Sequence, residues 1–345
     1  MPTPIRDRRV RPVPAHMNAA FIDAPGGPGA IRYGVLPVPV PGPGQLVLRT
    51  EALAVNHVDV LVRSGAYATE LDFPFVVGRD VVGIVVRRGE GTEGFSSGER
   101  LWCNSLGHAG RQGSFSEYVL TEADRSYRLP PGVEAADAVA VLHGAATAHL
   151  GLMNKARMAA GELVIILGAA GAVGSAAVQL AAEAGCRVIA VAGARDADWV
   201  AALGAGAVLD YRDPDMVVKL ARAAAQDASV VWDCSGSMAI DDQARLLGLG
   251  GRIIHTAGLD AHQEIDTGAL YRRDISVHGF AISNASVPDL AVAAAHLNAL
   301  FAGPGICTRI GATLPLSATA EAHRMLEAGK RHRIGGKIVV VPDPP

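Results

Sequence analysis

The sequence predicts an α/β fold, with a doubly wound parallel sheet in the second half of the chain and a mostly antiparallel β domain before it. Between about residues 140 and 282, apolar strand-like runs alternate with helix-like segments, which is typical of a parallel sheet covered by helices. Before residue 140, short β-rich pieces are separated by turns rich in proline and glycine, which favours antiparallel strands in a partly open barrel.

The strongest local signal is the stretch from Leu163 to Ala181. A buried strand over 163–167 is followed by Gly168, Gly171 and Gly174, and a helical apolar pattern starts at once. This order of strand, glycine turn and helix is what a dinucleotide pyrophosphate needs, because the glycines let the backbone approach the phosphates. The residues expected to contact the cofactor here are Ala170, Gly171, Ala172 and Val173.

The remaining elements complete this picture. Further strands of the parallel sheet are expected at 187–192, 207–209, 229–232, 252–256 and 275–280, with helices at 196–203, 214–225 and near 238–247. In the β domain, strands are expected at 45–50, 81–87 and 115–119, and a last strand at 337–341 is expected to return to it. The predicted domains are therefore 1–139 with 285–345 for the discontinuous β domain, and 140–284 for the dinucleotide-binding domain.

The composition excludes several classes of protein. Of 345 residues, 50% are hydrophobic and 19% are charged, and the net charge of -3 offers no basic surface for nucleic acid. No apolar run is long enough for a membrane span, and residues 2–14 lack the apolar core of a secretory signal. The four cysteines stand far apart without a CxxC motif, which indicates a reducing, cytoplasmic setting and argues against a structural zinc.

Short motifs along the chain carry a resemblance. They are Asn56-His-Val-Asp59, Arg63-Ser-Gly65 with Tyr67, Gly78-Arg-Asp-Val-Val-Gly83, Gly98-Glu-Arg100, Gly113-Ser-Phe-Ser-Glu-Tyr118, Thr147-Ala148, Ala169-x-Gly-x-x-Gly174 and Gly336-Lys-Ile-Val-Val340. In this order the chain resembles the medium-chain dehydrogenase/reductase superfamily. The resemblance implies a Rossmann dinucleotide-binding domain and a GroES-like catalytic β domain.

The branch is indicated by the metal ligands that are missing. Zinc members of the superfamily look like Cys-x-x-Asp in the first motif and Gly-His-Glu in the second, whereas Asn56 and Arg79 stand at those positions here. Zinc needs three or four N, S or O ligands, and an arginine would repel it. The chain therefore resembles the zinc-free quinone oxidoreductase (zeta-crystallin-like) branch. Zinc bound through His57, His108 or His143 is the alternative.

The resemblance also implies roles for individual residues. Tyr67 and Asn56 match positions that contact the substrate, and we expect them to donate hydrogen bonds to it; the alternatives are a packed loop tyrosine and a turn-forming asparagine. Thr147 matches a position at the nicotinamide, with a helix hydroxyl bonded to its own preceding turn as the alternative. Lys337 matches a position near the cofactor phosphates, with a solvated lysine at a strand edge as the alternative.

The residues that select between NADH and NADPH are expected at the end of the second strand of the parallel sheet. NAD-specific folds place an acidic residue there, about 20 residues beyond the glycines, but Gly193 occupies this position and Arg195 follows within reach of a 2′-phosphate. Tyr211 and Arg212 resemble a pair that flanks the adenosine phosphate in NADPH-dependent relatives. Nearby Asp196 and Asp198 are the opposing feature, unless they cap the next helix. NADPH is favoured.

These inferences predict a metal-free, NADPH-dependent oxidoreductase that reduces a quinone or an α,β-unsaturated carbonyl. An enoyl-thioester reductase, a zinc-independent alcohol dehydrogenase-like enzyme and a non-catalytic NADPH-binding structural or interaction protein are the alternatives. The strand at 275–280 looks like an exposed sheet edge, so we expect a homodimer joined through the cofactor domains.

Overall fold

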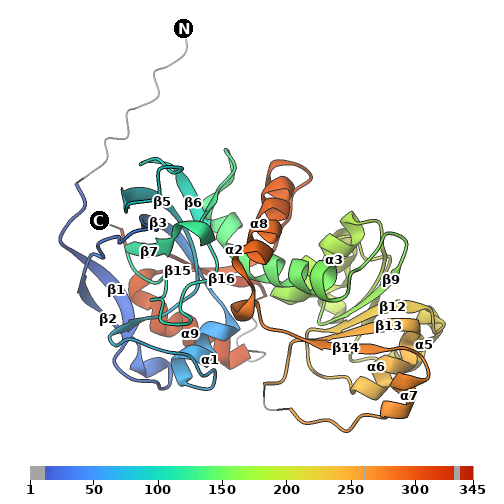
Figure 1. Cartoon of the computed structure of the whole chain (residues 1–345). Helices are drawn as coiled ribbons and strands as arrows, with labels where there is room; N and C mark the ends of the chain where they lie inside the picture. The colour runs from blue at the N-terminus through green and yellow to red at the C-terminus, as the bar shows by residue number, and fades with distance from the viewer. Residues whose placement is uncertain (1–11, 260, 330–334, 345) are drawn as a thin grey trace. The chain divides into compact units, whose positions relative to one another are not determined.

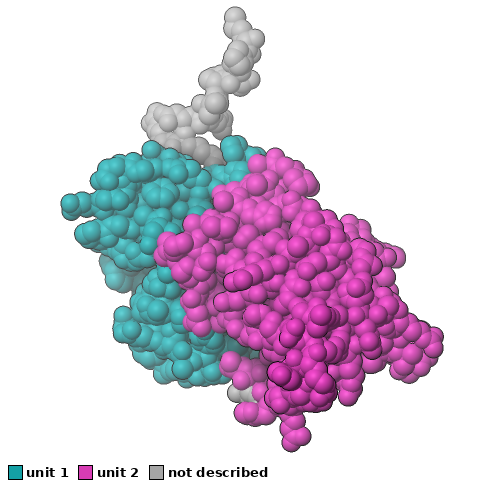
Figure 2. Space-filling model, turned by 45° about the vertical axis from the view of Figure 1, so that its right-hand side comes forward, with its two compact units in different colours: residues 1–140, 309–345 teal, residues 141–308 magenta. Residues whose placement is uncertain are grey.

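The computed structural model describes residues 12–259, 261–329 and 335–344, and it divides into two compact units. Unit 1 comprises residues 1–140 and 309–345, and unit 2 comprises residues 141–308 (Figures 1 and 2). The second division therefore comes after helix α8 and not at the expected 284/285, because α8 clusters with the parallel-sheet unit. Most of the proline-rich start expected at 2–14 lies outside the described residues.

Unit 1 is built mostly from antiparallel strands around an apolar core, and only β15 and β16 among its described strands pair in parallel. Its strands are β1 (His16–Ile22), β2 (Arg32–Pro37), β3 (Gln45–Val55), β4 (Phe75–Val76), β5 (Asp80–Arg88), β6 (Arg100–Cys103), β7 (Tyr118–Glu122), β8 (Tyr127–Arg128), β15 (Ile310–Pro315) and β16 (Lys337–Val341). Its helices are α1 (His57–Ser64) and α9 (Thr319–Ala328), and α2 (Ala135–His149) crosses into unit 2. The larger sheet has the order β15-β16-β3-β5-β6-β8, with β7 also on β3. The predicted return of the last strand is confirmed, since β16 pairs antiparallel with β3.

Unit 2 is the predicted doubly wound sheet. Its strands are β9 (Leu163–Leu167), β10 (Arg187–Ala192), β11 (Ala207–Asp210), β12 (Ala228–Asp233), β13 (Leu247–His255) and β14 (Ser276–Gly279). Its further helices are α3 (Ala172–Glu183), α4 (Ala197–Ala202), α5 (Met216–Ala224), α6 (Ile240–Leu246), α7 (Thr267–Tyr271) and α8 (Val287–Ala302). The described strands pair in parallel in the order β11-β10-β9-β12-β13-β14, with α3 on one face and α6 on the other (Figure 1). None of the described helices is long and apolar enough to cross a membrane.

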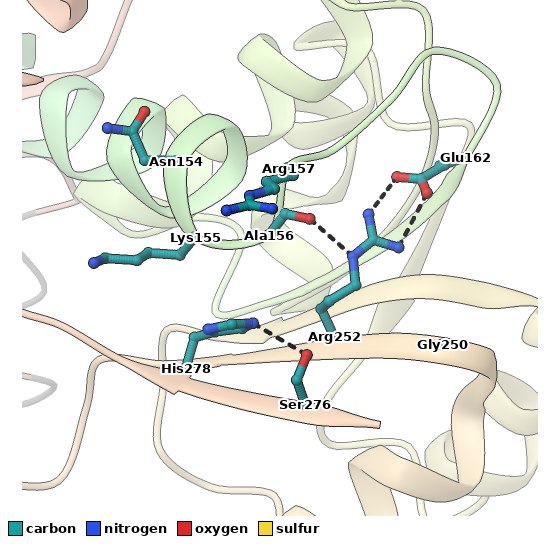
Figure 3. A pocket seen from close by; sticks show the side chains of 9 residues that line it. All are labelled: Asn154, Lys155, Ala156, Arg157, Glu162, Gly250, Arg252, Ser276 and His278. Atoms are coloured by element: carbon teal, nitrogen blue, oxygen red, sulfur yellow. Dashed lines mark hydrogen bonds and ion pairs between the residues drawn. The ribbon is translucent and has the colours of Figure 1, made fainter. Parts of the chain in front are cut away.

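A polar hollow of about 750 Å³ lies at the amino end of this sheet (Figure 3). Arg252 of β13 forms its rigid wall: Nη1 and Nη2 donate to the two Glu162 carboxylate oxygens at 3.0 and 2.7 Å, and Nε donates to the Ala156 carbonyl at 2.8 Å. The Arg252 bonds hold the pKa of Glu162 below its usual value. The Arg252–Glu162 bonds join β13 to the turn before β9, at the end of the sheet opposite the glycine turn.

We predict that Arg252→Met lowers the free energy of unfolding by about 1–3 kcal/mol, because a half-buried carboxylate loses charged hydrogen bonds. A carboxyl with a depressed pKa stabilises the fold above its ordinary pKa, and this is lost as pH falls through the folded pKa. The wild type should therefore lose more stability than the variant does between pH 7 and about pH 3, which lies below the ordinary glutamate pKa of 4.5. Thermal unfolding at both values checks this, with Lys155→Met, an exposed neighbour in the hollow, as the unaffected control. Equal acid sensitivity in wild type and Arg252→Met would contradict it.

Candidate functional site

The glycine turn of unit 2 brings the start of α3 against the end of β9. Gly168 has a left-handed φ of 72°, and the Ala169 N–H donates to the Val191 carbonyl at 3.0 Å, which ties the turn to β10. A Cβ on Gly174 would lie 2.3 Å from the Gly168 carbonyl oxygen, so only glycine lets the helix begin this close to the strand.

The turn leaves its backbone available to a ligand. Gly171 is the N-cap of α3, and Gly171 and Ala172 are exposed while Val173 is half-buried. The first N–H groups of a helix have no partner within the helix, and its dipole adds partial positive charge there. The predicted turn residues thus lie together at a helix start that fits a dinucleotide pyrophosphate.

The residues expected to distinguish the two nicotinamide cofactors also lie together. A Cβ on Gly193, at the end of β10, would lie 3.3 Å from the Tyr211 ring, so the tyrosine covers this glycine. The Arg212 guanidinium stacks 5.0 Å from the centre of the same ring. Arg195 is exposed and its Nε lies 3.6 Å from the carboxylate of Asp196. Asp196 precedes α4 without a side-chain cap bond, so its charge faces an arginine and not the helix start.

Thr147 lies in α2 and is nearly buried. Its hydroxyl donates to the His143 carbonyl one turn earlier, at 2.7 Å. This is the bond expected of a helix threonine, and it leaves the oxygen lone pairs for a ligand. Its contact with a nicotinamide stays a prediction.

In unit 1, strand register gathers a buried polar cluster, which we call the Asn56 cluster: Asn56, Asp59, Arg79, Asp80 and Lys337. The end of β3 lies beside the starts of β5 and β16, since Ala54 pairs with Asp80 and Val55 pairs with Ile338. Asn56 follows β3 directly, so its side chain meets residues from both neighbouring strands. All five side chains are less than a tenth exposed.

The Asn56 side chain is the centre of this cluster. Its Nδ2 donates to the Asp80 carboxylate at 2.9 Å, and its Oδ1 accepts a hydrogen bond from the Lys337 ammonium. Its backbone N–H donates to the Asp59 carboxylate at 2.8 Å, which fixes the start of α1. The second Nδ2 hydrogen has the Ala54 carbonyl as its acceptor, at 3.4 Å, so Asn56 could donate to a substrate only by giving up an existing bond. Lys337 is buried in a strand that lies between β15 and β3, so it is not a solvated lysine at a strand edge.

Burial sets the charges in the Asn56 cluster. It raises the pKa of Asp59 to about 6 and that of Asp80 to about 7, against the opposing effect of Arg79 and Lys337. Burial also lowers the pKa of Lys337 and of Arg79, and the two carboxylates counter this. The cluster is a set of compensated charges within the core of unit 1.

A zinc ion does not fit this cluster. The two positions that carry zinc ligands in other members hold Asn56, whose amide is hydrogen-bonded to Asp80, and the cation Arg79. The Lys337 ammonium is bonded to the same amide. Among the residues that the structure describes, no group of three or more His, Cys, Asp or Glu side chains could hold a metal ion.

Tyr67 lies beside Arg79 at the accessible side of the cluster. Gly65 ends α1 in the left-handed region, with φ 83°, and Tyr67 then bonds back to the helix through its N–H to the Leu61 carbonyl at 3.0 Å. Its half-buried ring meets that of His108 edge to face, with centroids 5.9 Å apart. Burial lowers the pKa of Arg79, and a charge on Tyr67 would act against this after those of Asp59 and Asp80.

His108 lies next to Tyr67, and the sequence singled it out by name only as an alternative zinc ligand, although its loop, 103–112, is one where substrate specificity is expected. Its Nδ1 lies 3.0 Å from the Thr69 hydroxyl, and the cations Arg79, Arg111 and Arg125 act with burial to lower its pKa. A glycine-rich loop without motif spacing carries it, so the one available signal was that such loops often hold functional residues.

Comparisons with known proteins agree with this architecture. Residues 42–131 match the alcohol dehydrogenase GroES-like domain, and residues 172–296 match the domain of zinc-binding dehydrogenases. The quinone oxidoreductase of Sus scrofa is 29% identical over 310 residues, which is 89% of this chain and 93% of the pig protein. The crystal structure of an NAD-dependent alcohol dehydrogenase is 30% identical, with a TM-score of 0.84 over 95% of this chain and all of the other. A mycobacterial protein solved in complex with NADPH is 27% identical, with a TM-score of 0.80 over 94% of this chain and all of the other.

The fold, the glycine turn and these matches define the class: the chain belongs to the medium-chain dehydrogenase/reductase superfamily and is an oxidoreductase. Within the superfamily it belongs to the quinone oxidoreductase branch.

Proposed function

We propose that this protein is an NADPH-dependent reductase of quinones or α,β-unsaturated carbonyls that works without a metal. The observation that carries the proposal is the Asn56 cluster, in which Asn56 and Arg79 fill the positions where zinc-dependent members hold their metal. Unit 2 would hold the dinucleotide at the glycine turn, and unit 1 would hold the acceptor near Tyr67. The quinone oxidoreductases among its relatives support this choice.

The acceptor class follows from the charge that must be stabilised. Bound NADPH would supply a hydride. A zinc ion gives several kcal/mol of stabilisation to a developing alkoxide, and the part of the chain that the structure describes holds no group of side chains for such an ion. A conjugated acceptor spreads the same charge over an enolate or quinol-like oxygen, so hydrogen-bond donors, each contributing about 3 kcal/mol, can suffice. Of the two expected hydrogen-bond donors, Tyr67 and Asn56, we propose that Tyr67 donates to the acceptor. Asn56 would serve mainly to position Asp80 and Lys337.

We predict that the purified protein oxidises NADPH in the presence of a quinone or an enone, and not in the presence of simple alcohols or aldehydes. Chelation with EDTA should leave the rate unchanged. The test follows the absorbance of NADPH by stopped flow. The acceptors are a panel of quinones, enones and enoyl thioesters, with acetaldehyde as the simple aldehyde. Reduction of thioesters alone would favour an enoyl-thioester reductase, and tight NADPH binding without any oxidation would favour a non-catalytic binding protein.

We predict that NADPH has a lower KM than NADH, because Arg195 and Arg212 offer two cations to a 2′-phosphate, against one carboxylate at Asp196. Arg195→Ala should raise the KM for NADPH by about tenfold, the cost of one exposed charge-assisted contact. The KM for NADH should not change, and it serves as the internal control. A KM for NADH equal to or below that for NADPH in the wild type would end the proposal.

We further propose a homodimer joined through β14. This strand ends the described sheet order of unit 2, and its Val277 side chain is 36% exposed, so it offers an edge to a second copy. Sedimentation should give about twice the chain mass of 35.6 kDa. Val277→Lys should shift the protein to monomer, whereas Val292→Lys, on exposed α8, should not. A monomeric wild type would refute the dimer.

A further inference from the structure

We propose that His108 is a catalytic residue, which together with Tyr67 forms a two-donor site for the oxygen of the acceptor. This inference rests on the proposed reductase function and goes beyond it by naming the groups that take up the developing negative charge. Within the described residues, neither the Tyr67 hydroxyl nor Nε2 of His108 has a protein partner or is sealed from solvent. The two rings are adjacent, with centroids 5.9 Å apart, and the charge of Arg79 acts on His108.

We assign a tautomer to His108 through its contact with Thr69. The Thr69 oxygen accepts the Ala109 N–H at 2.9 Å, and it lies 3.0 Å from Nδ1 of His108. With one lone pair engaged by the amide, the hydroxyl keeps its hydrogen and a second lone pair, and the proposed site requires the arrangement in which this hydrogen goes to Nδ1. His108 is then neutral with its hydrogen on Nε2, the nitrogen that faces solvent.

The surrounding charges keep His108 in this neutral form. Arg79, Arg111 and Arg125 all disfavour a second proton and lower the pKa of the ring, in addition to burial. The same three cations favour an anionic oxygen bonded to Nε2. His108 thus acts as a neutral donor in a positive environment, and it needs no proton uptake between pH 6.5 and pH 8.

The loop that carries His108 is held firmly. Gly107 lies so close to the preceding segment that a Cβ would meet the Gly78 carbonyl at 2.6 Å, and the Leu106 N–H donates to the Arg79 carbonyl at 3.3 Å. The Gln112 side-chain oxygen accepts the Val76 N–H at 2.7 Å, which closes the far end of the loop on β4. Fixed donors stabilise a transition state more than mobile ones, because they do not have to be reoriented.

The chemical step balances without a protein acid. Bound NADPH would supply the two electrons as a hydride, and a new C–H bond would form at the β-carbon of an enone. The electron pair of the acceptor double bond moves to its oxygen, where Tyr67 and His108 donate hydrogen bonds to the enolate. Water then protonates the enolate, so the imidazole keeps its hydrogen throughout.

The test compares His108→Leu, which lacks a donor, with His108→Gln, whose amide can place an N–H near the Nε2 position. His108→Leu should lower kcat/KM by about 100-fold with little change in NADPH affinity, and His108→Gln should recover most of it. His16→Leu, at an exposed histidine of β1, is the matched control and should match the wild type. A His108→Leu variant within about twofold of the wild-type kcat/KM would overturn the inference.

Two readouts do not depend on turnover. Nitrogen-15 NMR of the protein alone should show His108 as the neutral Nε2–H form at pH 7, and Thr69→Val should abolish this preference. Binding of 4-nitrophenolate, a stable phenolate, should weaken about tenfold in His108→Leu and hardly in His108→Gln. If the wild type reduces no acceptor, the proposed function fails, and unchanged phenolate binding in His108→Leu would then also reject the donor site.

Discussion

The organisation of unit 1 depends on the single buried amide of Asn56. This side chain is bonded at once to a carboxylate on β5 and to an ammonium on β16, while its own backbone starts α1. A buried carboxylate or ammonium left without a partner is strongly destabilising, so each of these groups needs the others in place. The amide thereby holds three strands in one register and sets where α1 begins, and Gly65 at the end of α1 in turn places Tyr67.

The two units build their sites from different materials. In unit 2 the proposed cofactor site is mostly backbone: a left-handed Gly168, a helix that starts at Ala172, and a glycine that tolerates the close contact between them. In unit 1 the proposed acceptor site is made of side chains, Tyr67 and His108, which come from separate loops. A site built from backbone can be recognised in a sequence, because it restricts the residue types at fixed spacing. Side chains from separate loops come together only after folding, so no motif marks them.

This difference explains what the sequence could predict. The six parallel strands and the glycine turn could be read from apolar runs and glycine spacing, and β16 could be assigned to the first domain. The neighbourhood of Lys337 and Asn56 could not, because it depends on strand register between positions far apart in the chain. His108 could not be read either, since its partner Thr69 lies 39 positions away and no motif links them. The second boundary depends on where α8 packs, which its apolar pattern alone does not specify.

In the proposed metal-free site, the Asn56 cluster would be a weaker electrophile than a zinc ion. Zinc brings a double positive charge to one point, whereas the charge of Arg79 is shared with Asp59 and Asp80. Because the pKa of Asp80 is raised to about 7, its charge is partly lost near neutral pH, and the balance then shifts toward the cations. These carboxyls bind protons more tightly in the folded state, so their contribution to stability falls as pH rises from the ordinary aspartate pKa to about 7. Such a cluster supplies a mild positive field, and a mild field is sufficient only where the acceptor itself delocalises the incoming charge.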